Sequence, residues 1–592
     1  MLERMWSCAL AGLEGELVQV EVDIHHGLPH ITLVGLPDMT VRESKDRLYA
    51  ALRNAGFGFP MARITINLAP AHVRKIGPHY DLAIALGILA ASEQLHGSLN
   101  GELDDALVFG EVALDGRLRR THGIPPVAVA ARNHGFRRVI VPAANGAEAA
   151  LVPGLEVVAA DNLRQLVKHL RTGAPLPPIA SVPQQDVQAL HTDLGDVRGQ
   201  EHARRALEIA AAGGHNLSLT GPPGGGKTML ARCLPSILPP LSLEEALEVT
   251  AVYSVAGLLP SDVPLLQERP FRAPHHTISN AGLIGGGSWP RPGEVSLAPH
   301  GVLFLDELPE FDPAVLESLR QPIEDRRITI ARAAGSAVFP ASVTLIAARN
   351  PCPCGYHGDA DHACTCAVAA VLRYGRRVSG PLMDRIDLHL DVPRVPHEKL
   401  LGGPTGERSA TVRARVVAAR ERQRARLRAA DGPAASHTAV ERRRLRMLAE
   451  SAPERTGTEA SSQRVATPTS GLAGDDVVGA MTGGVPDAAP DAARTAVPFG
   501  VDDRSLPGFG FVGAAVARCN AELSPTQVRR DCRIDADGEA LLRTAMRRLG
   551  LSARAFHRIL KVARTIADLE AADGIATRHV AEALQYRPRQ GA

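Results

Sequence analysis

The chain has 592 residues, more than one hydrophobic core supports, and a typical size of about 150 residues per domain predicts three or four domains. Its 66 Lys and Arg residues nearly balance 64 Asp and Glu residues, so the net charge of +2 excludes a uniformly basic nucleic-acid-binding protein but not a local basic surface. The longest strongly apolar run, Leu82–Ala91, is much shorter than the ~20 residues of a membrane span, and the first residues lack the pattern of a secretory leader. We therefore expect a cytoplasmic protein without a membrane partner.

Residues 1–171 are expected to form an α/β or α+β domain. Alternation of apolar and polar residues predicts strands at Val18–Ile24 and Arg63–Leu68, whereas the apolar run Asp81–Ala91 predicts a buried helix. The mixture of strand-like and helical segments continues at Arg138–Val141 and Leu163–Leu170.

A proline-containing stretch separates this domain from the next one. Prolines between Thr172 and Gln185, together with the absence of a sustained period, predict a linker over residues 172–193. Residues 194–396 then alternate apolar strands with helices, which is typical of a nucleotide-binding parallel sheet.

The remaining residues divide into three segments. Seven arginines between Arg413 and Arg428 predict a basic helical segment over residues 397–428, whose thin apolar stripe favours a solvated helix face. Residues 429–512 are rich in Ala, Gly, Pro, Ser, Thr and Asp, and we expect a disordered insert because they bury too little surface to offset the entropy of ordering. Helical spacing returns afterwards and predicts a small helical domain over residues 513–592.

The most specific motif matches G-x-x-x-x-G-K-[ST] and lies between a strand candidate and a helix candidate. It consists of Gly221, Pro222, Pro223, Gly224, Gly225, Gly226, Lys227 and Thr228. In such a Walker A loop, glycines let backbone N–H groups wrap the phosphates of ATP, Lys227 reaches the β- and γ-phosphates, and Thr228 binds Mg²⁺. A glycine-rich turn without a ligand would not require the lysine and the hydroxyl.

A second motif is an apolar run, Gly301–Leu305, that ends in Asp306 and Glu307. Two carboxylates at the end of a buried strand indicate a Walker B strand, in which Asp306 holds Mg²⁺ and Glu307 polarises the water that attacks the γ-phosphate. A strand end that merely precedes two acids is the alternative.

Two further residues are catalytic candidates. Asn350 follows the strand candidate Val343–Ala348 and is placed to orient the same water. Arg385 is a candidate for an arginine inserted into a neighbouring subunit's site, and an internal salt bridge to Asp384 or Asp387 is the alternative. An inserted arginine requires an oligomer.

Four of the eight cysteines lie within fifteen residues and are Cys352, Cys354, Cys364 and Cys366. Four thiolates suffice for a tetrahedral zinc site, although paired C-x-C is tighter than the usual spacing. A reduced loop without metal is the alternative, and a disulfide framework is not indicated.

The chain resembles the YifB/ComM family of magnesium-chelatase-like AAA+ ATPases over nearly its whole length except the insert. The matching segments are Val34–Asp38, Asn67–Ala71, Arg198–Gln200, Gly285–Gly287, Pro292–Leu297 and Asn350–Gly355. The resemblance implies an α/β fold with an AAA+ P-loop parallel sheet core, an N-terminal α+β domain like ribosomal protein S5 and the Lon protease domain, and a C-terminal helical lid. It also implies a homo-hexameric ring, with Arg385 as the arginine finger and Arg554 as sensor 2.

In the helix-2-insert group of these ATPases, segments such as Arg269–Ser296, between the Walker motifs, and the expected hairpin Arg326–Phe339 face the central pore. On this resemblance, five basic residues are candidates for sequence-independent DNA contacts, with internal salt bridges as the alternative: Arg272, His276, Arg291, Arg327 and Arg332.

The resemblance also raises and then excludes a protease activity. In Lys75–Asp81, which is similar to the nucleophile segment of Lon, His79 stands where the catalytic serine is expected, and a lysine without its serine cannot perform that acyl transfer. The function that the resemblance implies is a hexameric ATP hydrolase that acts as a DNA helicase or translocase and drives branch migration in recombination or DNA uptake. A magnesium-chelatase-like ATPase that remodels a protein partner is the alternative.

Overall fold

A computed structural model describes residues 1–95, 103–179, 192–287, 289–332, 335–359, 361–396, 406–431 and 517–588, which belong to one compact unit. Residues 180–191 of the expected linker and 432–512 of the expected insert lie outside the described residues. Among the described residues, no helix is both long and apolar enough to cross a bilayer.

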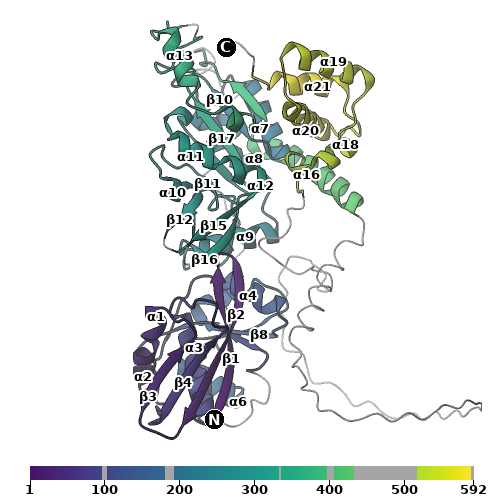
Figure 1. The fold of residues 1–592 in the computed structure, drawn as a ribbon. Helices are drawn as coiled ribbons and strands as arrows, with labels where there is room; N and C mark the ends of the chain where they lie inside the picture. Colours follow the sequence, from purple (N-terminus) through teal and green to yellow (C-terminus); the bar gives the residue numbers. More distant parts are fainter. Residues whose placement is uncertain are drawn as a thin grey trace, which may run out of the picture. The chain divides into compact units, whose positions relative to one another are not determined.

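The N-terminal part is built on a seven-stranded mixed sheet with the order β3-β4-β2-β1-β5-β8-β9 (Figure 1). The β2 strand pairs antiparallel with β1 and β4, and the remaining neighbours are parallel. The strands are β1 (Leu2–Ala11), β2 (Glu14–His25), β3 (His30–Val34), β4 (Arg63–Ala69), β5 (Ala106–Val108), β8 (Arg138–Pro142) and β9 (Glu156–Ala160), and a separate pair is β6 (Glu111–Val112) with β7 (Leu118–Arg119).

Helices pack on this sheet and bury most of its apolar side chains. They are α1 (Met39–Arg42), α2 (Ser44–Asn54), α3 (Asp81–Ala91), α4 (Ile124–Asn133), α5 (Gly146–Ala149) and α6 (Leu163–Thr172). The prediction of a buried helix at residues 81–91 is confirmed, since all but one of the residues of α3 are buried. In α6, by contrast, only one face is apolar and buried, because polar and charged residues such as Arg164, Gln165 and Lys168 occupy the other face.

The second part contains a five-stranded parallel sheet with the order β11-β14-β17-β10-β18. Its strands are β10 (Leu217–Thr220), β11 (Phe271–Arg272), β14 (Val302–Leu305), β17 (Thr344–Arg349) and β18 (Leu388–Asp391). The sheet has an apolar core that includes the wholly buried β14, as expected for a parallel sheet covered by helices.

One helix that accompanies this sheet precedes its first strand, and the other helices and the hairpins come from the connections between its strands (Figure 1). The helices are α7 (Glu201–Gly213), α8 (Lys227–Ile237), α9 (Leu243–Val255), α10 (Asn280–Ile284), α11 (Pro313–Ser318), α12 (Arg320–Asp325), α13 (Val368–Gly375) and α14 (Gly380–Met383). Two antiparallel pairs are β12 (Gly285–Gly286) with β13 (Arg291–Pro292), and β15 (Arg327–Arg332) with β16 (Gly335–Pro340).

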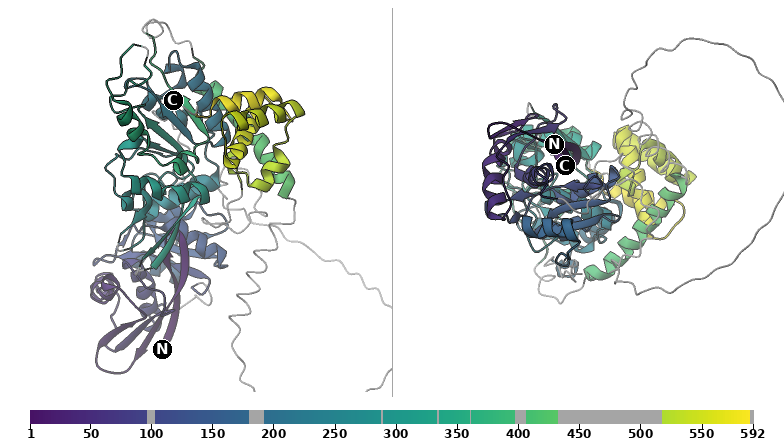
Figure 2. Two further views of the ribbon diagram at one scale, coloured as in Figure 1. Left: turned by 45° about the horizontal axis from the view of Figure 1, so that its top comes forward. Right: turned by 90° about the horizontal axis from the view of Figure 1, so that it is seen from below.

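A long helix, α16 (Ser409–Asp431), lies beside the C-terminal helices, as both views in Figure 2 show. These helices are α18 (Pro525–Asp531), α19 (Ala536–Arg548), α20 (Ala553–Leu569) and α21 (Thr577–Gln585). Their buried residues share one hydrophobic cluster with α7, α8 and the parallel sheet. The first three residues of the expected insert, 429–431, are the end of α16.

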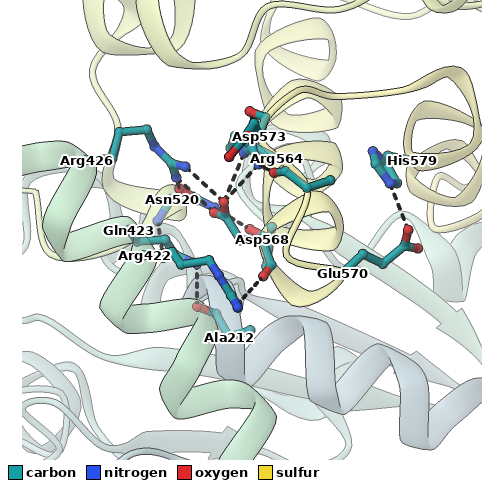
Figure 3. Close-up of polar contacts among 12 residues, drawn as sticks. Ala212, Arg422, Gln423, Arg426, Asn520, Arg564, Asp568, Glu570, Asp573 and His579 are labelled. Atoms are coloured by element: carbon teal, nitrogen blue, oxygen red, sulfur yellow. Dashed lines mark hydrogen bonds and ion pairs between the residues drawn. The ribbon is translucent and has the colours of Figure 1, made fainter.

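The expectation of a solvated basic face on residues 397–428 is wrong for part of α16. Figure 3 shows that Arg426 reaches Asp568 of α20, with nitrogen–oxygen distances of 2.8 and 2.9 Å. Arg422 donates to the backbone carbonyl of Asp568 at 3.0 Å, and Arg420 donates to the carbonyl of Ala211 at 2.9 Å. The positive charge of this helix therefore serves partly to attach it to its neighbours.

Candidate active site

The candidate catalytic residues follow three adjacent strands of the parallel sheet. In the register of the sheet, Thr220 at the end of β10 pairs with Arg349 at the end of β17, and Leu305 at the end of β14 pairs with Ala347. Because the carboxyl ends of parallel strands meet at one edge, the residues that follow them are brought together there.

The loop after β10 is shaped for a close approach of phosphate groups to the backbone. A Cβ atom at Gly221 would lie only 2.1 Å from the carbonyl oxygen of Val392, so no larger residue fits without movement. Gly224 and Gly226 have φ values of +76° and +83°, which residues with a side chain rarely adopt. The amide of Gln200 donates to the carbonyl of Gly225 at 2.7 Å and fixes the loop from outside.

Lys227 begins α8 and points back into the loop. Its ammonium donates to the carbonyls of Gly221 and Pro222 at 2.7 and 2.9 Å and to Oδ1 of Asn350 at 3.1 Å. Burial lowers the pKa of Lys227 from its ordinary value, and the nearby carboxylates of Asp306 and Glu307 oppose that change. The helix N-terminus and this ammonium together favour a bound anion.

The hydroxyl of Thr228 and the carboxylate of Asp306 meet at the same edge, with an Oγ1–Oδ2 distance of 2.9 Å. Both offer oxygen ligands, which Mg²⁺ prefers, and the glycine-rich cradle accommodates the phosphates to which the metal binds. The described residues therefore fit Mg²⁺ and ATP.

Glu307 directly follows Asp306 and has an exposed carboxylate. Its φ of +51° is the left-handed conformation, and its N–H donates to Oδ1 of Asp306 at 3.0 Å. His276 lies beside it, with 3.6 Å between Nδ1 and the Oε2 atom of Glu307. The structure thus places His276, predicted as a DNA contact, next to the candidate catalytic carboxylate.

Arg385 and Arg554 lie apart from this edge of the sheet. Both line a cavity of about 470 Å³ between the sheet domain and the C-terminal helices, and its described lining includes no Walker A or Walker B residue. Arg385 pairs with Glu324 and donates to the carbonyl of Pro381 at 2.8 Å. Its ion pair is therefore with Glu324 rather than with either of the aspartates weighed from the sequence.

The other basic candidates differ in their surroundings. Arg272 forms a bidentate ion pair with Glu294, at 2.6 and 2.7 Å. This is the internal salt bridge that was the alternative to a DNA contact. Arg291 on β13 and Arg327 and Arg332 on β15 are exposed. Their role in DNA contacts stays a prediction.

The structure brings the four clustered cysteines together immediately after β17. Their Sγ atoms all lie within 4.8 Å of one another. This is the one group of three or more potential metal ligands found among the described residues.

The segment that is similar to the Lon nucleophile is buried. His79 stacks on Phe109 with 4.3 Å between the ring centroids, and burial lowers the pKa of His79 to about 3. Lys75 is fully buried and donates to the carbonyl of Pro70. These contacts give both residues a packing role.

Sequence reasoning missed two neighbours of the site. Gln200 belongs to a matched segment, but no local pattern indicates that its amide holds Gly225. The backbone carbonyl of Val392 restricts position 221 to glycine. Since every residue has such a carbonyl, the identity of the Val392 side chain gives no indication of this contact. The pairing of β18 with β10 brings Val392 to the loop, whereas Gln200 reaches it from the start of α7.

Comparison with known families gives three matches along the chain. The description "Magnesium chelatase, subunit ChlI" matches residues 193–400, "Subunit ChlI of Mg-chelatase" matches residues 20–145, and "Magnesium chelatase, subunit ChlI C-terminal" matches residues 511–587. The N-terminal part is also 33% identical over 147 residues to Lon protease 2 of Bacillus subtilis, covering 22% of this chain and 25% of that protein. The predicted α/β fold, with a Lon-like N-terminal domain and C-terminal helices, is confirmed.

Several relatives match over almost the full length. Competence protein ComM of Haemophilus influenzae is 39% identical over 590 residues, covering 98% of this chain and 97% of ComM. The uncharacterized protein YifB of Escherichia coli is 38% identical over 582 residues, covering 98% of this chain and 96% of YifB. With the phosphate loop and its acids at one sheet edge, these matches establish that the chain belongs to the YifB/ComM family of magnesium-chelatase-like AAA+ ATPases.

Proposed function

We propose that this ATPase is a homo-hexameric motor that translocates on DNA and promotes branch migration in recombination or DNA uptake. The observation that carries the ATP-dependent part is the meeting of Lys227, Asp306 and Asn350 at one edge of the parallel sheet. Phosphoryl transfer depends mainly on such positioning and on electrostatic stabilisation.

Each residue of the site has a distinct task in this proposal. Thr228 and Asp306 would hold Mg²⁺, which would supply neutralisation of the phosphate charge. Lys227 stabilises negative charge on the β- and γ-phosphates. Glu307, whose carboxylate is exposed, orients the attacking water and takes its proton, and the Asn350 amide restricts the position of that water.

The positions of two arginines that lie apart from this edge support the proposed ring. Arg385 and Arg554 line a cavity that none of the Walker residues reaches. In a ring, a neighbouring subunit would receive Arg385 as its arginine finger and Arg554 as its sensor 2. Such an arginine supplies about 10³- to 10⁵-fold in rate, so hydrolysis would depend on the subunit interface.

Two observations support DNA as the partner. A relative over the full length is named Competence protein ComM, which agrees with the proposed role in DNA uptake. Arg327 and Arg332 lie exposed on the β15–β16 hairpin, where they are available for phosphate contacts that do not depend on sequence. The alternative is a motor that remodels a protein partner, which the three matches to a magnesium chelatase subunit favour.

The test compares ATP turnover with and without branched DNA at low salt, where phosphate contacts survive. We expect stimulation in the wild type, and weaker DNA binding in the Arg327→Ala/Arg332→Ala variant. Loss of two phosphate contacts reduces the slope of log affinity against log salt by about 2. Arg543→Ala, an exposed arginine of α19, is the matched control.

Each outcome separates the candidates. Stimulation that the hairpin variant loses and the control retains supports a DNA motor. Full ATPase activity without any response to branched DNA favours the protein-remodelling alternative. A mass in ATP that corresponds to a monomer would contradict the ring.

A further inference from the structure

The four clustered thiols have the spacing of a metal site. The Sγ–Sγ distances are 3.3 Å for Cys352 to Cys354, 3.7 Å for Cys352 to Cys364 and 3.6 Å for Cys354 to Cys364. Zinc–sulfur bonds of about 2.3 Å in a tetrahedron place sulfur atoms about 3.8 Å apart. All four cysteines are free, and their Sγ atoms, that of Cys366 included, lie within 4.8 Å of one another, so all four can be ligands of one ion.

The backbone around the first cysteine pair supports the same geometry. The N–H of Gly355 donates to the carbonyl of Cys352 at 3.0 Å, and the N–H of His357 donates to Sγ of Cys352 at 3.3 Å. Gly355 has a φ of +87°, which permits the tight turn. N–H donors to a sulfur stabilise its thiolate form and hold a metal ligand in place.

This loop is in direct contact with the phosphate loop. Asn350, which accepts a hydrogen bond from Lys227, is two residues before the first cysteine. A Cβ atom at Gly355 would lie 2.5 Å from Cδ of Pro223, a Walker A residue, so the two loops pack without a gap.

The far side of the cysteine loop is also held. The guanidinium of Arg394, shortly after β18, lies 5.4 Å from the ring centre of Tyr356. Its Nε atom is 3.5 Å from a carboxylate oxygen of Asp359. The loop thus contacts the phosphate loop on one side and Arg394, after β18, on the other. Within the loop, the four thiols determine the conformation.

We propose that Cys352, Cys354, Cys364 and Cys366 bind one Zn²⁺, and that this ion positions Asn350 and the wall of the phosphate loop for ATP hydrolysis. The second half of this proposal rests on the proposed ATPase site. The cysteines are positioning residues, because they reach the reacting atoms only through Asn350 and Pro223. His357 and His362 belong to the same loop and are not needed for a four-sulfur site.

The first experiment measures metal in the full chain, purified from zinc-supplemented cells, by inductively coupled plasma mass spectrometry. We expect one zinc per chain, and loss of most of it in Cys354→Ser and Cys364→Ser. Cys8→Ala removes a buried cysteine of β1 and should retain the metal. Zinc-free wild type that also shows no thiolate-to-metal absorption after addition of Co²⁺ would overturn the site.

The second experiment uses wild-type protein, so that it does not depend on the folding of a variant. Zinc is removed with a mercurial thiol reagent and a chelator, the thiols are restored, and turnover and fluorescent-nucleotide affinity are measured before and after Zn²⁺ is returned. We expect about 10- to 100-fold lower turnover without zinc and recovery with it. Unchanged turnover in protein shown to be zinc-free overturns the positioning role, whereas zinc-loaded protein without any turnover refutes the proposed ATPase function and leaves the metal site standing.

Discussion

Asp568 is the centre of the polar contacts that attach α16 to the C-terminal helices. Its carboxylate accepts from Arg426 at 2.8 and 2.9 Å, from Asn520 at 2.8 Å and from Arg564 at 3.1 Å (Figure 3). Asp568 is 1% exposed and Arg564 is 2% exposed. The substitution Asp568→Asn keeps the shape of the side chain but leaves two arginines without their shared negative charge.

The expected cost follows from this burial. Removal of one partner of a buried ion pair costs about 3–5 kcal/mol, because the remaining charge stays desolvated. We therefore expect the free energy of local opening of α20 to fall by about 3 kcal/mol or more. Since each 1.4 kcal/mol is a factor of ten, amide protection in α20 should fall by roughly 10²-fold or more.

The assay is hydrogen exchange of the full chain, followed by mass spectrometry on peptides from residues 553–569. Asp573→Asn is the matched control, because it makes the same charge change five residues later at an exposed position and should cost less than about 0.5 kcal/mol. Turnover should also fall in Asp568→Asn, because α20 carries Arg554 in its first turn. Equal protection in the two variants would refute the assignment of Asp568 as the main attachment.

Three further changes test other parts of the molecule. Gly221→Ala forces a Cβ against the Val392 carbonyl, so we expect kcat/KM for ATP to fall by about 10²-fold in a phosphate-release assay. His79→Phe should flatten the pH dependence of N-terminal stability, measured by denaturant unfolding with Trp6 fluorescence after the other tryptophan is replaced by phenylalanine. In the parent, the pKa of His79 is about 3 in the folded state and about 6.5 in the unfolded state. The unfolded state therefore takes up the proton first as the pH falls, and the free energy of unfolding decreases by about 2 kcal/mol between pH 7 and pH 5. Arg385→Ala should lower kcat by about 10³-fold while nucleotide affinity, measured by fluorescence titration, changes little.

Each of these changes has its own control. Gly375→Ala adds a Cβ into open space and should leave turnover unchanged, and an equal effect of both glycine variants would contradict the close-approach argument. His26 is exposed, so His26→Gln should leave the pH dependence as in the parent. The same unchanged pH dependence in His79→Phe would contradict the prediction for His79. Arg376 is exposed, and Arg376→Ala is the control for Arg385→Ala. A normal kcat in Arg385→Ala would exclude Arg385 as an arginine finger.

The sequence predicts well those features that depend on neighbouring residues. The apolar run at residues 81–91 has no polar face, and the structure buries it as α3. The Walker A pattern predicts a strand and a helix on its two sides, and β10 and α8 occupy these places. Such patterns report local periodicity and turn chemistry, which the chain retains whatever its distant contacts are.

The remaining features depend on partners that are far apart in sequence. The arginines of α16 predict a solvated face from composition alone. Arg426 nevertheless forms an ion pair with Asp568, which is 142 residues away in the sequence. His276 similarly meets Glu307 only after β11 and β14 are placed side by side. Periodicity shows which face of an element is polar and does not show what that face contacts.

In the proposed mechanism, Glu307 acts at a site in which Lys227 holds the phosphates of ATP. The most direct measurement is phosphate release in single turnover, with nucleotide binding measured in parallel, for the wild type, Glu307→Gln and Glu310→Gln. Glu310 is an exposed glutamate three residues later and is the matched control. We predict that Glu307→Gln retains ATP and releases phosphate about 10²- to 10⁴-fold more slowly, whereas Glu310→Gln resembles the wild type. Phosphate release from Glu307→Gln at the wild-type rate would contradict the account.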